Sequence, residues 1–551
     1  MLQSVLSPFA PAQPERWTSY RTLEGFTVAE CVVEQLEAEG IDAVFGIPGG
    51  YVSPFLGVLR GHPRMRFVIA CHEGGAAFMA DGYARAGGRL GVCLVTAGPG
   101  ATNALTGIAS AHLDGVPVLA ISGQVPTDRF GLAAMQESTV EGGVDTVALL
   151  HHATAYSTSI VDAGSFPRLF RRALSVAHGV PRGAVHLSFP ANVARQRLER
   201  VSLPVAPDRR PPAPACDPAD AEAAFRLLSV AQRPLLYVGS GARDALETMG
   251  DGFRELAERW GIPVVTSMRG KGLFPETHEL SLGVLGMAGS HRADRYVEDG
   301  VDVLMVLGSR LGEWASQNFS PRIRAAHAVI QVDVNPASIG QFLPPQLPIV
   351  ADVRAVLAAM LECARDAGEP DAARVAERLE TVRVLREEVP PWAEPAKLED
   401  EGTPLKPQRL MAELDASLHG GVDLYVDMGN CTGWATHCLR VSPPTRVFYP
   451  SGLSSMGWSC GAVIGGKLAR PERAAVALVG DGAFLMNGTE VNTAARYGVG
   501  AVYVVLNDDS LGMVNHGEHA QNGGAYPLDD PFYGLGGPDL AKFAESLGAA
   551  A

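Results

Sequence analysis

Positive charge is scarce in this chain. Lys and Arg number 45 against 60 Asp and Glu, which leaves a formal net charge of −15 at pH 7. Nucleic acids and anionic membranes are bound through clustered positive charge, so the deficit argues against both as partners. Long apolar runs are also lacking, since none approaches the roughly 20 residues needed to cross a bilayer. The beginning of the chain has no basic segment followed by an apolar one, so we expect a soluble protein that is neither exported nor anchored.

Paired cysteines are missing as well. The eight cysteines lie singly along the chain, and none forms a C-x-x-C motif. A disulfide scaffold needs a high density of cysteines, so none is expected to hold this fold together. We expect reduced thiols in a cytoplasmic protein.

Hydrophobic residues, in contrast, make up 47% of the 551 residues, enough to bury several cores. Helical stretches such as residues 28–39 alternate with short apolar runs. Apolar strands separated by helices indicate parallel sheets that helices cover on both faces. The runs expected to form strands are 43–45, 91–96, 116–122, 234–238, 263–267, 302–307, 328–332, 424–427, 474–479 and 501–506.

Proline and charge divide the chain. Residues 204–218 are dense in proline and predict an extended linker, and the charged helical run 371–389 ends before Pro390 and Pro391. The predicted fold class is α/β, with three doubly wound parallel-sheet domains. The predicted organisation is an N-terminal arm over 1–26, a first domain over 27–195, a linker over 196–222, a central domain over 223–370, a linker helix over 371–404 and a third domain over 405–551.

The most informative stretch lies in the third domain. One apolar run ends at Gly480-Asp481-Gly482, and after an intervening helix a second run ends at Asn507-Asp508. Both clusters then lie at carboxyl ends of parallel strands, where open α/β sheets bind ligands. Glycine lets the backbone approach a phosphate, a helix N-terminus offers it amides, and two acids supply hard oxygen ligands for Mg²⁺. A turn aspartate between glycines is common without any ligand, so a structural role is the alternative.

This stretch resembles the thiamine-diphosphate motif, in which G-D-G is followed after a helix by N-N or N-D. Other segments resemble acetolactate synthases, namely 41–50, 72–85, 98–103, 411–430 and 451–461. The chain is therefore identified as a divergent member of the acetolactate synthase-like family. The resemblance implies a pyrimidine-binding, a central and a diphosphate-binding domain, in that order.

The same resemblance implies thiamine diphosphate and Mg²⁺ as cofactors. It makes Asp481, Asp508 and the Ser510 carbonyl the metal ligands. The residues that it implies for cofactor binding are Gly429, Asn430, Ser454, Met456, Gly480, Asp481, Gly482, Ala483, Asp508, Ser510, Leu511, Gly512 and Met513.

Activation of this cofactor requires a carboxylic group on its aminopyrimidine ring. The resemblance gives this catalytic role to Glu73, whereas a glutamate that merely satisfies a helix N-terminus is the alternative. Met456 would bend the cofactor over its side chain, although ordinary core packing is also open for a methionine. The Ser454 carbonyl would accept a hydrogen bond from the aminopyrimidine.

The expected reaction comes from the resemblance. It implies decarboxylation of a 2-oxo acid, with pyruvate as donor, and addition of the acyl-carbanion equivalent to a carbonyl acceptor. Gln136 lies where acetolactate synthases carry F-Q-E and is a candidate for a hydrogen bond in the substrate pocket. Two roles are considered for each of three histidines, proton transfer and a structural role, namely for His112, His151 and His152. The alternatives are a 2-oxo-acid decarboxylase or flavin-linked oxidase, and a non-catalytic cofactor-binding protein.

Several positions depart from the family pattern. Residues 515–517 read Asn-His-Gly where the family brings a tryptophan over the acceptor site, which predicts a reshaped acceptor pocket. Asp508 replaces an asparagine and adds negative charge beside the diphosphate. In the central domain, residues 308–314 correspond to a G-A-R-F-D-D-R stretch that binds flavin in the family. This chain has the arginine of that stretch as Arg310, so FAD is one possible cofactor. Residues 239–241 are a weak dinucleotide signal and more often a turn.

Glu73 and Asp481 lie in different predicted domains but would hold opposite ends of one small molecule. In the family this occurs across a subunit interface, so we expect a homodimer at least, or a homotetramer of two dimers. The resemblance also predicts a further strand and helix after residues 543–548. We therefore expect a C-terminal tail that this sequence does not contain.

Overall fold

The computed structural model describes residues 20–205, 213–418 and 420–551. The chain divides into two compact units, Met1–Pro211 and Pro212–Ala551. The first unit holds one parallel sheet and the second holds two, each covered by helices on both faces, which confirms the predicted α/β class. Within the three described ranges, no helix combines the length and the hydropathy of a membrane span.

The sheet of the first unit has the strand order β3-β2-β4-β5-β7-β6, and all of its strands are parallel. Every residue of the four inner strands is buried, as expected for a sheet with two covered faces. The strands are β2 (Ala43–Gly46), β3 (Arg66–Ile69), β4 (Gly91–Val95), β5 (Val118–Gln124), β6 (Tyr156–Ser159) and β7 (Val185–Pro190).

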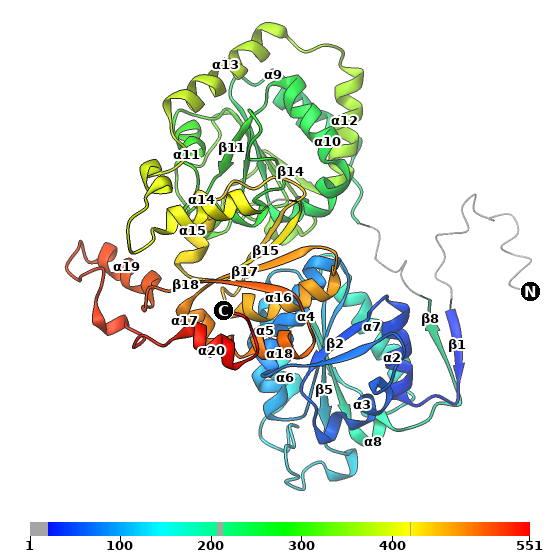
Figure 1. The fold of residues 1–551 in the computed structure, drawn as a ribbon. Coiled ribbons are helices and arrows are strands. Elements are labelled where there is room, and N and C mark those ends of the chain that lie inside the picture. The colour runs from blue at the N-terminus through cyan, green and yellow to red at the C-terminus, as the bar shows by residue number, and fades with distance from the viewer. Residues whose placement is uncertain (1–19, 206–212, 419) are drawn as a thin grey trace, which may run out of the picture. The chain divides into compact units, whose positions relative to one another are not determined.

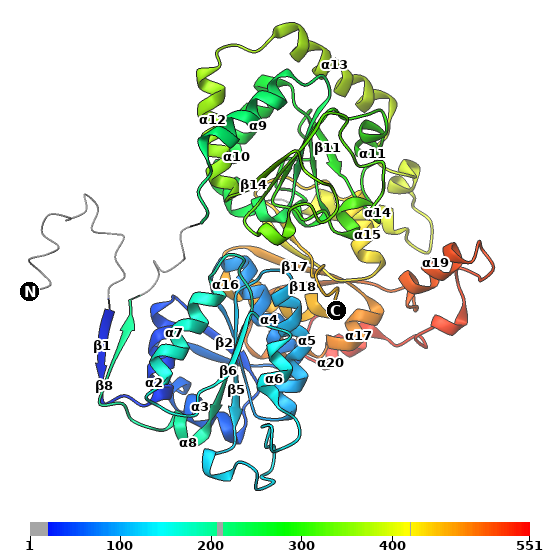
Figure 2. The ribbon, with the colours of Figure 1, turned by 180° about the vertical axis from the view of Figure 1, so that it is seen from behind.

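Helices cover this sheet from both sides (Figures 1 and 2). One face carries α4 (Glu73–Gly87), α5 (Pro99–Leu113) and α6 (Thr146–His151). The other face carries α2 (Val28–Ala38), α3 (Ser53–Leu59), α7 (Phe166–Ala177) and α8 (Ala191–Ala194).

The predicted N-terminal arm and first linker meet in a small separate sheet. Strand β1 (Tyr20–Glu24) pairs antiparallel with β8 (Arg200–Pro204), so part of each segment forms a strand. The remainder of the arm, residues 1–19, and linker residues 206–212 lie outside the described residues.

The central sheet has the order β11-β10-β9-β12-β13-β14, again all parallel. Its strands are β9 (Pro234–Val238), β10 (Val264–Thr266), β11 (Ser281–Val284), β12 (Val303–Leu307), β13 (Ala328–Asp333) and β14 (Leu347–Val350). One face packs against α9 (Pro218–Val230), α10 (Arg243–Trp260) and α12 (Val353–Asp366), and the other against α11 (His291–Glu298) and α13 (Ala372–Glu388).

Helix α13 covers the stretch predicted as a charged linker helix, and it packs onto the central sheet. Val382 and Leu385 belong to the core of one face. The buried guanidinium of Arg378 donates hydrogen bonds to carbonyls at the ends of α9 and α10, including those of Leu228 and Trp260. Cations favour the carboxyl ends of helices, which explains a buried arginine at this position.

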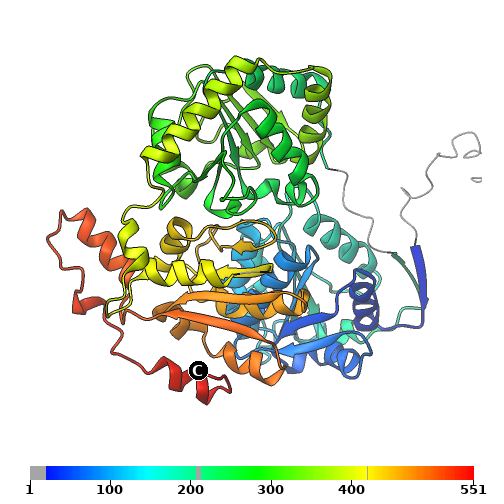
Figure 3. The same cartoon turned by 45° about the horizontal axis from the view of Figure 1, so that its top comes forward.

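The C-terminal sheet has the order β16-β15-β17-β18. Its strands are β15 (Val422–Val426), β16 (Arg446–Phe448), β17 (Ala474–Gly480) and β18 (Ala501–Leu506). Helices α14 (Pro407–Ser417) and α15 (Asn430–Cys438) pack on one face, and α16 (Trp458–Ala469), α17 (Asp481–Asn487), α18 (Glu490–Arg496) and α20 (Leu540–Ser546) on the other. Helix α19 (Gly512–Gln521) follows β18 and extends beyond the sheet (Figure 3).

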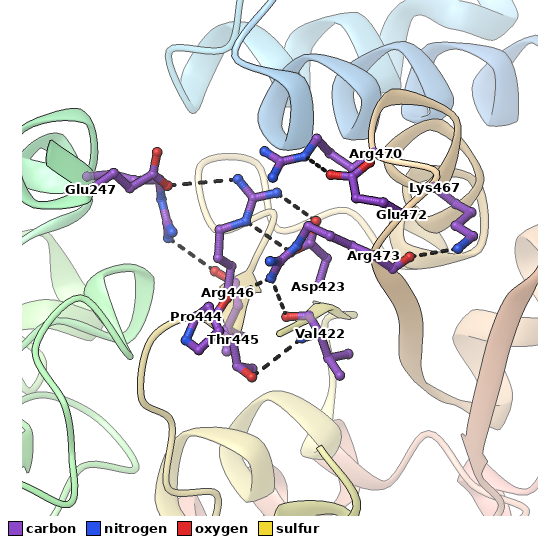
Figure 4. Close-up of polar contacts among 12 residues, drawn as sticks. Glu247, Val422, Asp423, Pro444, Thr445, Arg446, Lys467, Arg470, Glu472 and Arg473 are labelled. Carbon is purple, nitrogen blue, oxygen red and sulfur yellow. Dashed lines mark hydrogen bonds and ion pairs between the residues drawn. The ribbon is translucent and has the colours of Figure 1, made fainter. Parts of the chain in front are cut away.

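At the amino end of this sheet, one buried carboxylate binds two arginines (Figure 4). Asp423 Oδ2 lies 2.6 Å from Arg446 Nη2, and its Oδ1 lies 2.7 Å from Arg473 Nε. Arg473 also donates to the Pro444 carbonyl over 2.7 Å. Asp423 on β15 therefore ties β16 to the segment that precedes β17.

Short 3-10 helices complete the description. They are η3 (Gly50–Val52), η4 (Thr127–Arg129), η5 (Ser240–Ala242), η6 (Met268–Gly270), η7 (Glu313–Ser316), η8 (Pro336–Ser338), η9 (Pro395–Glu399) and η10 (Pro531–Tyr533).

Candidate active site

Two of the predicted metal ligands meet at the carboxyl end of the C-terminal sheet. Gly480 pairs with Leu506 in the ladder of β17 and β18, so the two strands end side by side. Asp481 is the first residue of α17, and its carboxylate accepts from the Gly482 amide over 2.7 Å. The Asp508 amide donates to the other oxygen of Asp481 over 3.1 Å.

The electrostatics of this pair favour a cation. Burial raises the pKa of Asp508, and the neighbouring charge of Asp481 raises it further. No Lys or Arg within the described ranges forms an ion pair with either carboxylate. Two adjacent carboxylates, of which Asp481 is buried, are unfavourable unless a proton or a cation neutralises them, and their oxygens are the ligands that Mg²⁺ prefers. The residues present therefore fit a divalent metal.

The start of α19 lies close to Asp508. A Cβ at Gly512 would lie 2.6 Å from Asp508 Oδ2 and 2.9 Å from Asn430 Nδ2, so any larger residue would displace these two side chains. Asn430, the first residue of α15, donates from Nδ2 to His516 Nδ1 over 3.3 Å. The predicted cofactor residues Asn430, Asp508 and Gly512 thus converge, and His516 joins them.

Ser510 lies between Asp508 and α19 in an irregular segment. An antiparallel bridge pairs it with Gly534, and the hydrogen bonds of this bridge come from the amides of Leu511 and Leu535. The Ser510 carbonyl takes no part in these two bonds. Its hydroxyl is buried and has no hydrogen-bond partner among the described residues. A buried polar atom of this kind at the edge of an acid pair is consistent with a ligand-binding segment.

The turn before α16 brings the predicted Ser454 and Met456 toward α17. Ser454 has a φ of +60°, and Gly457 at the helix N-cap has a φ of +78°. A Cβ at Gly482 would lie 3.7 Å from Met456 Cε, so Met456 borders the first turn of α17. Met456 also packs against the core formed by residues such as Phe484. The geometry is thus compatible with both roles considered for this methionine.

The remaining predicted cofactor residues lie at the ends of the same elements. Gly429, with a φ of +146°, is the N-cap of α15, and Ala483 is buried in the first turn of α17. Leu511 is the N-cap of α19, and Met513 lies in the first turn of that helix.

In the first unit, Glu73 is the first residue of α4 and is 8% exposed. Asn103 on α5 donates from Nδ2 to Glu73 Oε2 over 3.0 Å. A Cβ at Gly100 would lie 3.6 Å from Glu73 Oε1, and one at Gly98 would lie 3.4 Å from Gln136 Cβ. Glu73 and Gln136 therefore flank the same turn at the start of α5.

The candidate histidines lie elsewhere in this unit. His112 is at the carboxyl end of α5, roughly 20 Å along the helix from the turn that Glu73 borders. Burial lowers the pKa of His112. His151 and His152 are exposed at the end of α6. The structure therefore separates His112 from Glu73.

The glycines at 239–241 have a packing role in the central domain. The Gly241 amide donates to the Gly308 carbonyl over 3.0 Å, and a Cβ at Gly239 would lie 2.2 Å from the same oxygen. This backbone contact requires glycine without any dinucleotide.

Two residues beside the predicted site residues, Asn103 and Asp427, were given no role from the sequence. Asn103 and Asp427 lie inside segments that carry the family resemblance, but their contacts depend on residues far away in the chain. Asp427 directly follows strand β15 and is completely buried. An acid at the carboxyl end of a parallel strand is the signal that points to it, as it does for Asp481 and Asp508.

Comparison with known proteins identifies three family domains in the chain. Residues 26–149 match the thiamine pyrophosphate enzyme N-terminal TPP binding domain, 221–360 match the central domain, and 427–551 match the C-terminal TPP binding domain. These matches follow the order that the sequence resemblance implies.

Relatives cover nearly the whole chain. A putative acetolactate synthase large subunit of Mycobacterium tuberculosis is 35% identical, over 95% of this chain and 92% of the relative. A probable acetolactate synthase large subunit of Methanococcus aeolicus is 31% identical, over 94% and 86%. An acetolactate synthase large subunit of Corynebacterium glutamicum is 33% identical, over 100% and 84%. The chain therefore belongs to the thiamine pyrophosphate enzyme family, and it is similar to acetolactate synthase large subunits along nearly its whole length.

Proposed function

We propose that this chain is a carboligase that decarboxylates a 2-oxo acid, with pyruvate as the donor, and transfers the acyl unit to a carbonyl acceptor. Similarity to acetolactate synthase large subunits over 94–100% of the chain carries the reaction class. The acid pair at the strand ends supports the cofactors, thiamine diphosphate and Mg²⁺.

Asp481 and Asp508 are proposed to hold the metal together with the Ser510 carbonyl. Amides at the starts of α15, α17 and α19 are proposed to bind the diphosphate, because helix N-termini carry partial positive charge. When bound, the cofactor supplies an electron sink that stabilises the carbanion left by loss of CO₂. Asp508 contributes a second negative charge, which a divalent cation balances.

Glu73 is proposed to hold a proton at the aminopyrimidine end of the cofactor. Its carboxyl group is buried, and Asn103 fixes the orientation of Oε2 over 3.0 Å. Gln136, next to the same turn, is proposed to donate a hydrogen bond to the substrate. Acceptor selection is assigned to the start of α19, where residues 515–517 lack the large side chain of the family pattern.

The proposed assembly is a homodimer or homotetramer with its active sites at the subunit interface. Glu73 belongs to the first unit and Asp481 to the second. Sedimentation measurements should show no active monomer, and full activity in a monomer would contradict this assembly. The proposed compartment is the cytoplasm, which the five buried cysteine thiols support, since reducing conditions preserve thiols.

FAD is proposed as an optional ligand of the central domain, on the basis of Arg310. No reaction step is assigned to it. The glycines at 239–241 give FAD no support, because their packing against Gly308 explains them. A visible flavin absorption band in the purified protein would establish the ligand, and its absence after incubation with FAD would remove the proposal.

Product analysis tests the proposed reaction. The purified protein is incubated with pyruvate, thiamine diphosphate and Mg²⁺, first alone and then with added aldehydes, ketones and enones. We expect a hydroxy-ketone or a 2-hydroxy-2-methyl-3-oxo acid as the product. Acetaldehyde and CO₂ as the sole products would indicate a plain decarboxylase. Glu73→Gln is the matched variant, and unchanged turnover in it would contradict the role given to Glu73.

A further inference from the structure

One buried carboxylate in the C-terminal sheet binds the segments on which the proposed cofactor site is built. Asp427 directly follows β15 and is 0% exposed. Its Oδ1 accepts from the Gly457 amide over 2.8 Å, and its Oδ2 accepts from the Ser459 amide over 2.7 Å. These two amides belong to the N-terminus of α16, thirty residues further along the chain.

The rest of Asp427 contacts two other segments of the site. Oδ1 also accepts from the Met428 amide over 2.9 Å, and the main-chain carbonyl accepts from the Thr432 hydroxyl over 2.6 Å, which holds the start of α15. The Asp427 amide donates to the Leu478 carbonyl on β17 over 2.9 Å. Asp427 is therefore hydrogen-bonded to the start of α15, to the start of α16 and to strand β17, which directly precedes Asp481.

The turn before α16 needs such an anchor. Ser454 and Gly457 both have positive φ, and a Cβ at Gly457 would lie 2.5 Å from Asn487 Nδ2. Non-glycine residues with positive φ are unfavourable unless the surrounding structure holds them. The bonds from the Gly457 and Ser459 amides to one carboxylate supply that constraint on the carboxyl side of Met456.

We propose that Asp427 is a positioning residue, which fixes the turn carrying Ser454 and Met456 relative to Gly429, Asn430 and Asp481. The inference rests on the proposed function, because Met456 and Asp481 are cofactor residues there. It adds the requirement that the turn be in place before the cofactor binds. Preorganisation of this kind removes an ordering cost from the activated complex.

Strand β15, which directly precedes Asp427, contains a residue that serves as a matched control. Asp423 lies at the opposite end of β15, is also buried, and accepts from Arg446 and Arg473 instead of main-chain amides. The variants Asp427→Asn and Asp423→Asn therefore make the same chemical change on one strand. An asparagine at 427 must present an NH₂ group to one of the amide donors, which removes an acceptor from the turn.

The first experiment measures the hydrogen-deuterium exchange rate at the reactive carbon of bound thiamine diphosphate, with saturating cofactor and Mg²⁺. Asp427→Asn should lower this rate by roughly tenfold, the effect of losing about one charge-assisted hydrogen bond. Asp423→Asn should lower the thermal midpoint and leave the exchange rate within about twofold of wild type. An unchanged rate in Asp427→Asn, or an equal fall in both variants, would overturn the inference.

A second measurement uses the wild-type protein without cofactor and covers the case in which Asp427→Asn does not fold. Amide exchange followed by mass spectrometry should show residues 456–460 protected before any cofactor is added. Rapid exchange in this segment, followed by protection on addition of thiamine diphosphate and Mg²⁺, would show that the cofactor, and not Asp427, orders the turn. If the wild-type protein binds no cofactor, the proposed function is refuted. Protection of residues 456–460 would still show whether the turn is ordered without cofactor, as the role proposed for Asp427 requires.

Discussion

The buried acids at the two ends of the C-terminal sheet have different kinds of hydrogen-bond partners. At the amino end, Asp423 is neutralised by the guanidinium groups of Arg446 and Arg473. At the carboxyl end, Asp427 and Asp481 are held by main-chain amides, and Asp508 lies beside Asp481. The first arrangement is complete without a ligand. The pair of Asp481 and Asp508 has no guanidinium partner among the described residues, and this difference separates a structural carboxylate from a pair that is arranged to bind a cation.

Removal of an acid from the carboxyl end should have the largest effect in the comparison. Asp481→Ala should raise the dissociation constant of thiamine diphosphate in the presence of Mg²⁺ by roughly 100-fold or more, equivalent to about 3 kcal/mol. The cause is loss of a charged oxygen ligand and of the acceptor for the Asp508 amide. Isothermal titration calorimetry measures the change, with Asp423→Ala as the control. Equal affinity in Asp481→Ala and wild type would disprove the metal assignment.

Removal of the acid from the amino end should instead affect stability. Asp423→Ala leaves two largely buried guanidinium groups without their carboxylate and should lower the free energy of unfolding by about 3–5 kcal/mol. Urea denaturation measures this change, while the affinity for thiamine diphosphate should stay near that of wild type. Glu472→Ala breaks the exposed pair with Arg470 and should leave the stability nearly unchanged, because solvent screens exposed ion pairs. Similar losses in the two variants would contradict the importance of burial.

The smallest effect concerns pH. Burial raises the pKa of Asp427 to about 6, so the folded protein binds this proton more tightly than the unfolded chain does. The stabilisation is therefore complete below about pH 4 and is lost as the pH rises through 6. The neighbouring thiols of Cys431 and Cys460 stay neutral in this range, because burial raises the pKa of each.

The Asp427→Asn variant has no ionisable group at this position. Its comparison with wild type therefore isolates the contribution of Asp427 to the pH dependence of stability. The stability advantage of wild type over Asp427→Asn should shrink by roughly 2 kcal/mol between about pH 4 and pH 7.5, in the absence of cofactor and Mg²⁺. Urea denaturation at several pH values gives the curve for each protein. A stability difference that does not change with pH would show that Asp427 is ionised throughout.

The sequence predicted most of the inner strands and missed most of the edge strands, although it missed the buried inner strand β7 and found the edge strand β18. Residues 234–238 and 501–506 were expected to be strands, and they have those bounds as β9 and β18. Uninterrupted apolar runs identify such segments. Strands β3, β6 and β14 lie at sheet edges and are partly exposed. Polar residues interrupt β3 and β6, and a proline interrupts β14, so none of the three gives a clear strand signal.

The candidate site divides along similar lines. Asp481 and Asp508 could be inferred from sequence because each follows an apolar strand and parallel strands end at one edge. The contact of Asn103 with Glu73 joins two helices, and the bonds of Asp427 reach residues thirty positions away. Such contacts depend on packing and register, which single-sequence patterns do not specify. Asp427 was the last residue of the predicted strand 424–427, and its long-range amide partners distinguish it only in three dimensions.

The main-chain anchorage of the turn before α16 affects how this protein can be engineered. Asp427 accepts hydrogen bonds from the main-chain amides of Gly457 and Ser459, and these bonds do not depend on the side chains of the turn. Substitutions at 454–456 therefore leave the anchor intact while they change the surface that faces the first turn of α17. A library at these three positions, with Asp427 and Gly457 kept, should therefore vary the proposed cofactor-binding side chains Ser454 and Met456 in a turn whose anchor is unchanged.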